Sequence, residues 1–259
     1  MAMIRVLHLT DTHVVAAEDL ARPPSTFAGA VAAVQGRSTS DLLRLVLDAV
    51  TTDGFDPDVV LHTGDAADDG EPASYVRLRE LLGAIDAPVL AVAGNHDRAD
   101  QLAVALGQEP DAVRSTDLDG WRLVLLDTSI YDRDHGEVLP DALEAFEQAI
   151  ATAPGAVLVG LHHPPISACD EPSCQLRQAD AVLAILDRDP NVRAVVSGHL
   201  HVTDDIHRNG VDYLLSPSSC LQLHHHHPLR EHNTTPTPVG ARLLELHDDG
   251  RVSSRLLWV

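Results

Sequence analysis

The chain has 259 residues, with 18 basic and 39 acidic side chains and a formal net charge of -21 at pH 7. All 18 basic residues are arginine, and the absence of lysine excludes a Walker-A phosphate loop, a Schiff-base lysine and a Ser-Lys catalytic pair. No two of the 16 glycines stand two or four positions apart, which excludes a G-x-G-x-x-G dinucleotide motif and a G-x-S-x-G nucleophile elbow.

Short runs rich in valine and leucine alternate along the chain with longer amphipathic stretches. Runs of this length and composition are typical of buried strands in an α/β core. The predicted strands are, in chain order, residues 4–9, 59–63, 89–93, 121–126, 156–161 and 192–197.

Apolar residues at helical spacing lie between several of these strands. One stripe covers residues 42–50, with Ser40 as its expected N-cap. A second covers residues 143–150 and opens at Pro140, and a third covers residues 182–186. Each stripe predicts a helix that packs on one face of a sheet.

The last part of the chain has a different pattern, because residues 213–215, 241–246 and 252–257 read as consecutive strands. A turn at residues 248–250 joins the last two as a hairpin. Strand–helix alternation followed by strands predicts an α/β fold with helices on the sheet faces, and favours a mixed sheet or a two-sheet sandwich over a purely parallel sheet. Residues 1–259 are expected to form one domain. Residues 17–39 and 217–240 are expected to be irregular, and the second, rich in His, Pro and Thr, to be a loop that covers a functional site.

Polar side chains follow five of the predicted strands, where open α/β sheets usually build their sites. The candidate metal ligands among them are Asp11, His13, Asp65, Asn95, His162, His199 and His201. Extended residues two apart point the same way, so Asp11 and His13 can address one ion. A turn can instead split His199 and His201 between two ions, with Asp65 as a bridge. Asp, Asn and His without Cys favour Mn, Fe, Zn or Co.

The blocks D-T-H, G-D-x-x-D-D-G, G-N-H-D, H-H-P-P and G-H-L-H, in this order, resemble the calcineurin-like metallophosphoesterase superfamily. The spacing and the H-H-P-P form resemble its bacterial class III cyclic-nucleotide phosphodiesterases. The resemblance runs from residue 11 to residue 201 and implies an αββα sandwich with two metal ions, Mn or Fe before Zn or Co. It implies that His96 contacts the substrate phosphate and protonates the leaving oxygen. Residues 217–223 resemble a stretch of bacterial cyclic-AMP phosphodiesterases, from which the tract at residues 224–227 departs.

The resemblance also implies two ligand groups that share one residue. One metal ion would be held by Asp11, His13, Asp65 and His201. The other would be held by Asp65, Asn95, His162 and His199. Taken singly, each of these residues is explained as an ordinary polar cap or turn at a strand end, but the ordered set favours a metal centre.

Charge arithmetic favours a phosphodiester substrate. Two divalent ions and two carboxylates leave a site charge of about +2, which a bridging hydroxide lowers to about +1. A phosphodiester monoanion then neutralises the site, whereas a monoester dianion exceeds it. In-line attack by that hydroxide on a small diester, 3′,5′-cyclic AMP or a 2′,3′-cyclic nucleotide, is the expected reaction. Glycerophosphodiesterase, phosphomonoesterase and nuclease activities are the enzymatic alternatives. A non-catalytic scaffold and a histidine-rich metal module at residues 224–227 are the others.

Neighbouring polar residues are expected to support the site rather than to bind metal. His163 is expected to face away from the site, and His8 and His62 are expected to be core histidines. Asp68 and Asp69 are expected to lie behind the ligands or to cap helices, and Asp97 or another carboxylate to hold the His96 tautomer. Cys220 is expected to be buried.

The negative charge repels polyanions, so no extended nucleic acid and no membrane surface are expected as partners. No apolar run approaches the roughly 20 residues of a membrane span, and no signal-peptide pattern is seen at the start. A cytoplasmic protein with reduced thiols is expected, although a Cys169–Cys174 bridge and a homodimer are left open.

Overall fold

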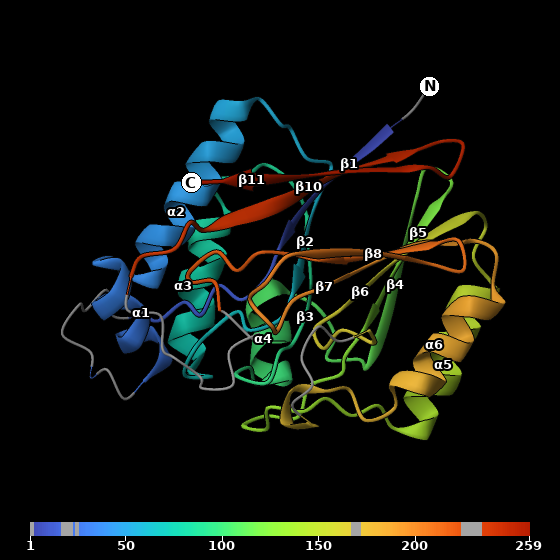
Figure 1. The fold of residues 1–259 in the computed structure, drawn as a ribbon, viewed down its shortest axis with the longest axis horizontal. Helices are drawn as coiled ribbons and strands as arrows, with labels where there is room; N and C mark the ends of the chain where they lie inside the picture. The colour runs from blue at the N-terminus through green and yellow to red at the C-terminus, as the bar shows by residue number, and fades with distance from the viewer. Residues whose placement is uncertain (1–2, 17–22, 24–25, 167–171, 224–234) are drawn as a thin grey trace.

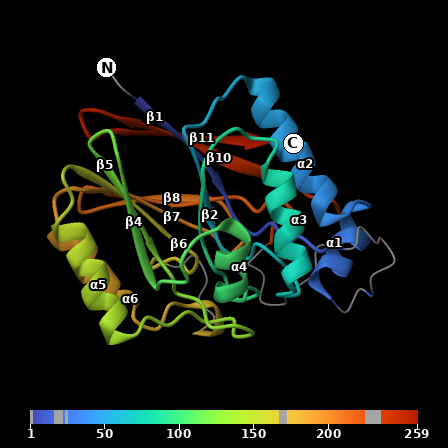
Figure 2. The same ribbon diagram turned by 180° about the vertical axis from the view of Figure 1, so that it is seen from behind.

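The computed structural model describes residues 3–16, 23, 26–166, 172–223 and 235–259. Two β-sheets pack face to face, and helices cover the outer face of each (Figure 1 and Figure 2). The α/β sandwich of two mixed sheets predicted from the sequence is therefore confirmed.

The first sheet contains both the start and the end of the chain. Its order is β11 (Val252–Trp258), β10 (Gly240–His247), β1 (Met3–Leu9), β2 (Val59–Thr63) and β3 (Val89–Val92). β1, β2 and β3 run parallel, while β10 is antiparallel to β1 and to β11.

The second sheet is built mainly from the middle of the chain. Its order is β4 (Val113–Leu118), β5 (Trp121–Leu126), β6 (Ala156–Leu161), β7 (Val192–Ser197), β9 (Val211–Leu215) and β8 (Asp204–Arg208). β5, β6, β7 and β9 are parallel, and the edge strands β4 and β8 are antiparallel to their neighbours.

Three apolar layers hold the sandwich together. The first sheet packs against α1 (Phe27–Gln35), α2 (Thr39–Asp53), α3 (Pro72–Leu82) and α4 (Ala99–Leu106). The second packs against α5 (Pro140–Ala151) and α6 (Ala179–Arg188), and a short 3-10 helix spans Pro172–Cys174. Leucine, valine and alanine side chains from both sheets, with Trp121, fill the layer between them. None of the described helices has the length and apolar character that crossing a membrane would require.

The expectation that residues 17–39 are irregular is wrong for α1. Thr26 caps this helix, since its hydroxyl accepts a hydrogen bond from the amide of Gly29, and Gly36 ends it with a left-handed φ of 66°. The cap of α2 is Ser38 rather than Ser40, because the Ser38 hydroxyl accepts from the amide of Asp41 at 3.1 Å.

Two strands of the described chain were not predicted, and the three predicted strands of the tail do not share one sheet. β4 and β8 are edge strands that carry charged and exposed side chains, so they lack the apolar run that marks a buried strand. β9 pairs with β7 in the second sheet, whereas β10 returns to β1 in the first. The strands of the tail are thus divided between the two sheets.

Candidate dinuclear metal site

The candidate ligands follow the carboxyl ends of β1, β2, β3, β6 and β7, which meet at one end of the sandwich. Beyond the strands, the loops after β1 and β2 stay paired, because the amides of Asp11 and His13 donate to the carbonyls of Gly64 and Asp65, both at 2.9 Å. This pairing brings segments more than fifty residues apart into one site.

The backbone at these positions is left-handed rather than extended. The φ angles are 53° at Asp11, 45° at His13, 51° at Asp65, 71° at His199 and 50° at His201. Side chains therefore converge through sharp turns, and the expectation that extended geometry aligns Asp11 with His13 is wrong in its reason. Non-glycine residues in this region are uncommon and cluster at functional sites.

The first ligand group is compact and fully buried. The ligand atoms of Asp11, His13, Asp65 and His201 all lie within 4.8 Å of one another. Nε2 of His201 is 3.2 Å from Nε2 of His13 and 3.2 Å from Oδ1 of Asp11. Nε2 of His13 is in turn 3.6 Å from Oδ2 of Asp65.

The second ligand group lies on the other side of the same carboxylate. Nε2 of His162 is 3.5 Å from Oδ2 of Asp65 and 3.1 Å from Oδ1 of Asn95. Nδ1 of His199 is also 3.1 Å from Oδ1 of Asn95, while its Nε2 is buried and has no hydrogen-bond partner. The structure thus brings all seven predicted ligands together in two groups.

Asp65 is shared through one oxygen only. Its Oδ1 accepts a hydrogen bond from the amide of His96 at 2.9 Å, which leaves Oδ2 to face both His13 and His162. Burial opposes ionisation of Asp65, but the neighbouring His162 and His96 hold its pKa well below the usual range. The shared oxygen therefore carries negative charge.

The hydrogen bonds of the histidines fit a metal centre. Nδ1 of His162 lies 2.8 Å from the Thr63 carbonyl, and Nδ1 of His201 lies 2.8 Å from the Leu221 carbonyl, so these nitrogens donate. In the neutral rings both Nε2 atoms are then acceptors, and they face the acceptor oxygens of Asn95 and Asp11. Either a second proton on each ring or a bound cation satisfies these contacts, and both place positive charge between the ring and the oxygen. Although burial disfavours a charged ring, Asp65 and Asp11 raise the pKa of His162 to about 9, which shows that the position attracts positive charge.

His96 lies beside the ligand groups and is more open than they are. Its side chain is 32% exposed, and its Nδ1 is 3.5 Å from Oδ1 of Asp68 and 3.3 Å from the Asp68 carbonyl. Burial opposes protonation of His96, yet the carboxylates of Asp65 and Asp68 raise its pKa above the ordinary value. The ring thus keeps a proton up to a higher pH, as a general acid requires.

Asp68, not Asp97, is the carboxylate that contacts His96. Asp97 turns the other way and accepts from the amides of Ala66, Ala67 and Gly94 at 2.9–3.0 Å, so it joins the loops after β2 and β3. Asp68 also accepts from the amide of Ala28 in the first turn of α1, as expected for a capping residue.

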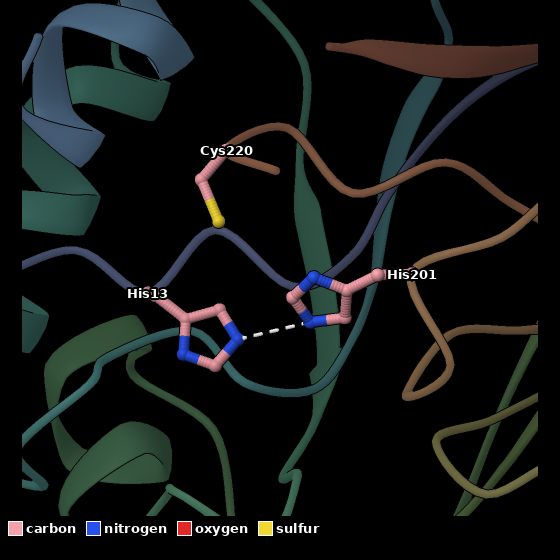
Figure 3. Close-up of side chains that lie close together, drawn as sticks. All are labelled: His13, His201 and Cys220. Carbon is pink, nitrogen blue, oxygen red and sulfur yellow. Dashed lines mark hydrogen bonds between the residues drawn. The ribbon is translucent and has the colours of Figure 1, made fainter. Parts of the chain in front are cut away.

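The segment after β9 supports the first ligand group. The hydroxyl of Ser218 donates to the Asp11 carbonyl at 2.8 Å, and the Cys220 thiol donates to the same oxygen at 3.3 Å. Figure 3 shows the Cys220 sulfur directed toward the rings of His13 and His201. Burial raises the pKa of this thiol, so it stays neutral and protonated. The expected loop at 217–240 thus reaches the site through residues 217–223.

Further predictions from the sequence concern buried histidines and cysteines. His8 and His62 are core histidines as expected, since His8 contacts the hydroxyls of Ser216 and Thr63 and His62 contacts that of Thr12. His163 does not face away, because its ring lies 4.4 Å from that of His199. Residues 224–227 and Cys169 lie outside the described residues.

Comparison with known proteins identifies the family. The chain matches the calcineurin-like phosphoesterase family over residues 4–203, which is most of its length. The chain belongs to the calcineurin-like phosphoesterase family. This match confirms the resemblance drawn from the motif blocks, and with it the expectation of a phosphoric-ester hydrolase.

Two bacterial relatives are similar to this phosphoesterase. The 3′,5′-cyclic adenosine monophosphate phosphodiesterase CpdA of Escherichia coli (strain K12) is 32% identical over 263 residues, covering 98% of this chain and 90% of that protein. The cAMP/cGMP dual specificity phosphodiesterase MT0825 of Mycobacterium tuberculosis (strain CDC 1551 / Oshkosh) is 32% identical over 225 residues, covering 83% and 67%. Among solved structures, a dimetal phosphatase from Danio rerio has a TM-score of 0.65 at 16% identity and covers 98% of both chains, which supports the fold.

Two glycines of this phosphoesterase test how tightly the site is packed. A Cβ at Gly94 would overlap the amide and Oδ1 of Asp65, and one at Gly198 would overlap Oγ1 of Thr10 and Oδ2 of Asp11. We expect Gly94→Ala and Gly198→Ala each to cost about 1–3 kcal/mol of stability and to lower metal affinity, because the carboxylates must move. Gly83→Ala, at the exposed end of α3, is the control and should stay within about 0.5 kcal/mol. Thermal unfolding and metal titration measure both; normal metal affinity in both site variants would contradict the packing argument.

Proposed function

We propose that this chain hydrolyses small phosphodiesters, with 3′,5′-cyclic AMP and related cyclic nucleotides as the main substrates. The observation that carries the proposal is the single oxygen of Asp65 that faces both ligand groups, with the open His96 ring beside it. The names of the bacterial relatives support the choice of substrate. The proposed ligands are those predicted from the sequence: Asp11, His13, Asp65, Asn95, His162, His199 and His201.

Mn and Fe are the proposed metals, and Zn or Co would also fit this donor set. Two carboxylates, one amide oxygen and four imidazoles combine oxygen and nitrogen donors, and the Cys220 thiol is left out of the proposed set because it donates to the Asp11 carbonyl. When bound, two such cations lower the pKa of water and neutralise phosphate charge.

The side chains around the ligands have distinct proposed roles. The protonated ring of His96 binds a phosphate oxygen and gives its proton to the leaving ribose oxygen. Asp68 orients that ring through Nδ1, which leaves Nε2 for the substrate. The carboxylate of Asp68 and the protonated His96 balance each other, so the site keeps the charge expected from the ligands alone.

Because that charge matches a monoanion, diesters should react faster than monoesters. We expect turnover of bis-p-nitrophenyl phosphate to exceed that of p-nitrophenyl phosphate by at least about 10-fold under saturating metal, since a surplus charge near ligand carboxylates costs more than 1 kcal/mol. Release of p-nitrophenol measures both. Faster turnover of the monoester would favour a phosphomonoesterase instead.

A substrate panel tests the proposal directly. Protein reconstituted with Mn, Fe or Zn is assayed with 3′,5′-cyclic AMP, 2′,3′-cyclic AMP, a glycerophosphodiester and bis-p-nitrophenyl phosphate, beside an Asn95→Ala variant. The greatest kcat/KM is expected for 3′,5′-cyclic AMP, with loss in the variant. A preference for the glycerophosphodiester would replace the proposal, and inactivity on the whole panel would favour a non-catalytic scaffold. A homodimer and a cytoplasmic location stay predictions.

A further inference from the structure

An aromatic side chain lies against the ligand histidines on the side of His96. Phe27 is the first residue of α1, and its ring centroid is 4.3 Å from that of His13 and 5.4 Å from that of His201. It is also 6.0 Å from the ring of His96. Phenylalanine is rare in this chain, with 3 among 259 residues, so an aromatic ring at the metal site is not a product of composition.

Phe27 is half-buried, unlike the residues that anchor α1. The helix buries Ala28, Val31 and Ala32 against the core of the first sheet, whereas Phe27 keeps part of its surface open. Its buried part packs against the same core, so the ring is supported on one side and partly exposed on the other. The ring of Phe27 is 6.0 Å from that of His96, whose side chain is 32% exposed, so two partly exposed rings lie close together at the site.

Both ends of α1 are fixed to the site. At its start, the amide of Ala28 donates to Oδ2 of Asp68 at 3.1 Å, and Oδ1 of that carboxylate is 3.5 Å from His96. At its end, the side-chain amide of Gln35 donates to the carbonyls of Cys220 and Thr237 at 2.9 and 3.0 Å. The ring of Phe27 is therefore held in place before any substrate binds, which lowers the entropic cost of stacking on it.

We propose that Phe27 is a specificity-determining residue on which the base of a cyclic nucleotide stacks while its phosphate is bound between the ligand groups and His96. The inference rests on the proposed function and names the group that recognises the nucleoside part. In a cyclic nucleotide one ribose separates base and phosphate, and the short distances from Phe27 to His13 and His96 suit that separation. Stacking needs no positive charge, so it can attract a nucleotide to a chain with a net charge of -21. It is also tolerant of base identity, so adenine and guanine should both be accepted.

The test compares ligands that differ only in the nucleoside. Binding of AMP and of inorganic phosphate to the metal-loaded protein is measured by calorimetry for the wild type, Phe27→Leu and Phe27→Tyr. Phe27→Leu keeps apolar volume but loses the aromatic face. It should weaken AMP binding on the order of 10-fold, leave phosphate binding and the metal content unchanged, and raise KM for 3′,5′-cyclic AMP more than it lowers kcat. Phe27→Tyr keeps an aromatic face and should bind AMP as the wild type does.

Tyr131 provides a matched control. It is 45% exposed, and the guanidinium of Arg98, two residues after His96, lies 5.0 Å from its ring. Tyr131→Leu should leave the ratio of AMP to phosphate affinity unchanged. The inference is overturned if Phe27→Leu weakens AMP and phosphate equally, if it depletes metal, or if the wild type binds AMP no better than phosphate. Failure of the proposed function is distinct, because it shows as wild-type inactivity on cyclic nucleotides.

Discussion

His96→Ala is expected to lower kcat on 3′,5′-cyclic AMP by about 10²- to 10⁴-fold while the protein keeps both metal ions. The reason is that His96 contributes only its backbone amide to Asp65, and this amide survives the substitution. Its imidazole, whose pKa is raised by Asp65 and Asp68 against the effect of burial, is the proposed proton donor. Steady-state kinetics and elemental analysis of the purified variant measure the two effects.

The leaving group provides an internal check on this role. A ribose alkoxide needs a proton to depart, whereas p-nitrophenolate is stable without one, so His96→Ala should cost much less on bis-p-nitrophenyl phosphate. His207→Ala, at an exposed histidine paired with Asp212, is the control and should leave both rates unchanged. Loss of both metals in His96→Ala would mean that His96 is a ligand rather than an acid.

The pH dependence of kcat provides a second test of the proposed role of His96 as general acid. A general acid acts only in its protonated form, and the pKa of His96 is raised, so activity is present below that pKa and lost as pH rises through it. The wild-type kcat on cyclic AMP should therefore fall on the alkaline side at a pH above the ordinary histidine value. In His96→Ala this alkaline fall should disappear. An unchanged alkaline limb in the variant would assign it to another group.

Much of this site could be predicted because each of its residues belongs to a short segment whose pattern is recognisable from the sequence alone. Each candidate ligand follows a short buried run rich in valine and leucine, and a strand end is recognisable from those few residues. The same local reasoning missed β4 and β8, whose charged side chains suit exposed edges. It also missed α1, a short helix whose Val31, Phe27 and Val34 pack on the core of the first sheet.

What the sequence could not give was the geometry that depends on distant segments. Asp11 and His13 adopt left-handed backbones while their amides pair with the loop after β2. No residue close to them in sequence indicates this pairing. Asp97 adjoins His96 in sequence, yet the turn at Gly94 sends its carboxylate to backbone amides, and Asp68 contacts the ring instead. Phe27 carried no signal of its own, since a single aromatic ring at the start of an alanine-rich run gives no periodicity.

Asp65→Asn should remove more of the metal centre than any other single substitution at the ligands. The shared oxygen lies 3.6 Å from the ligand nitrogen of His13 and 3.5 Å from that of His162. An asparagine that keeps its oxygen on the His96 amide must turn its NH₂ group toward both sites, where lone pairs are needed. We expect fewer than one tightly bound metal per chain and a loss of activity on the order of 10³-fold or more.

Asn95→Ala should weaken only the second metal site. Within the described residues, the side-chain oxygen of Asn95 contacts His162 and His199, which belong to the second ligand group. One metal per chain should remain, with affinity for the second lowered by about 10- to 100-fold. Asp69→Asn is the control for a charge lost from the same loop, since Asp69 accepts from the amide of Glu71. Metal titration of the three variants, beside a deletion of residues 224–227 that should still bind two ions, decides the matter. If Asp65→Asn and Asn95→Ala each lost the same single ion, Asp65 would not bridge two metals. If the deletion of residues 224–227 lost both ions, the metals would be held by that tract and not by the seven proposed ligands.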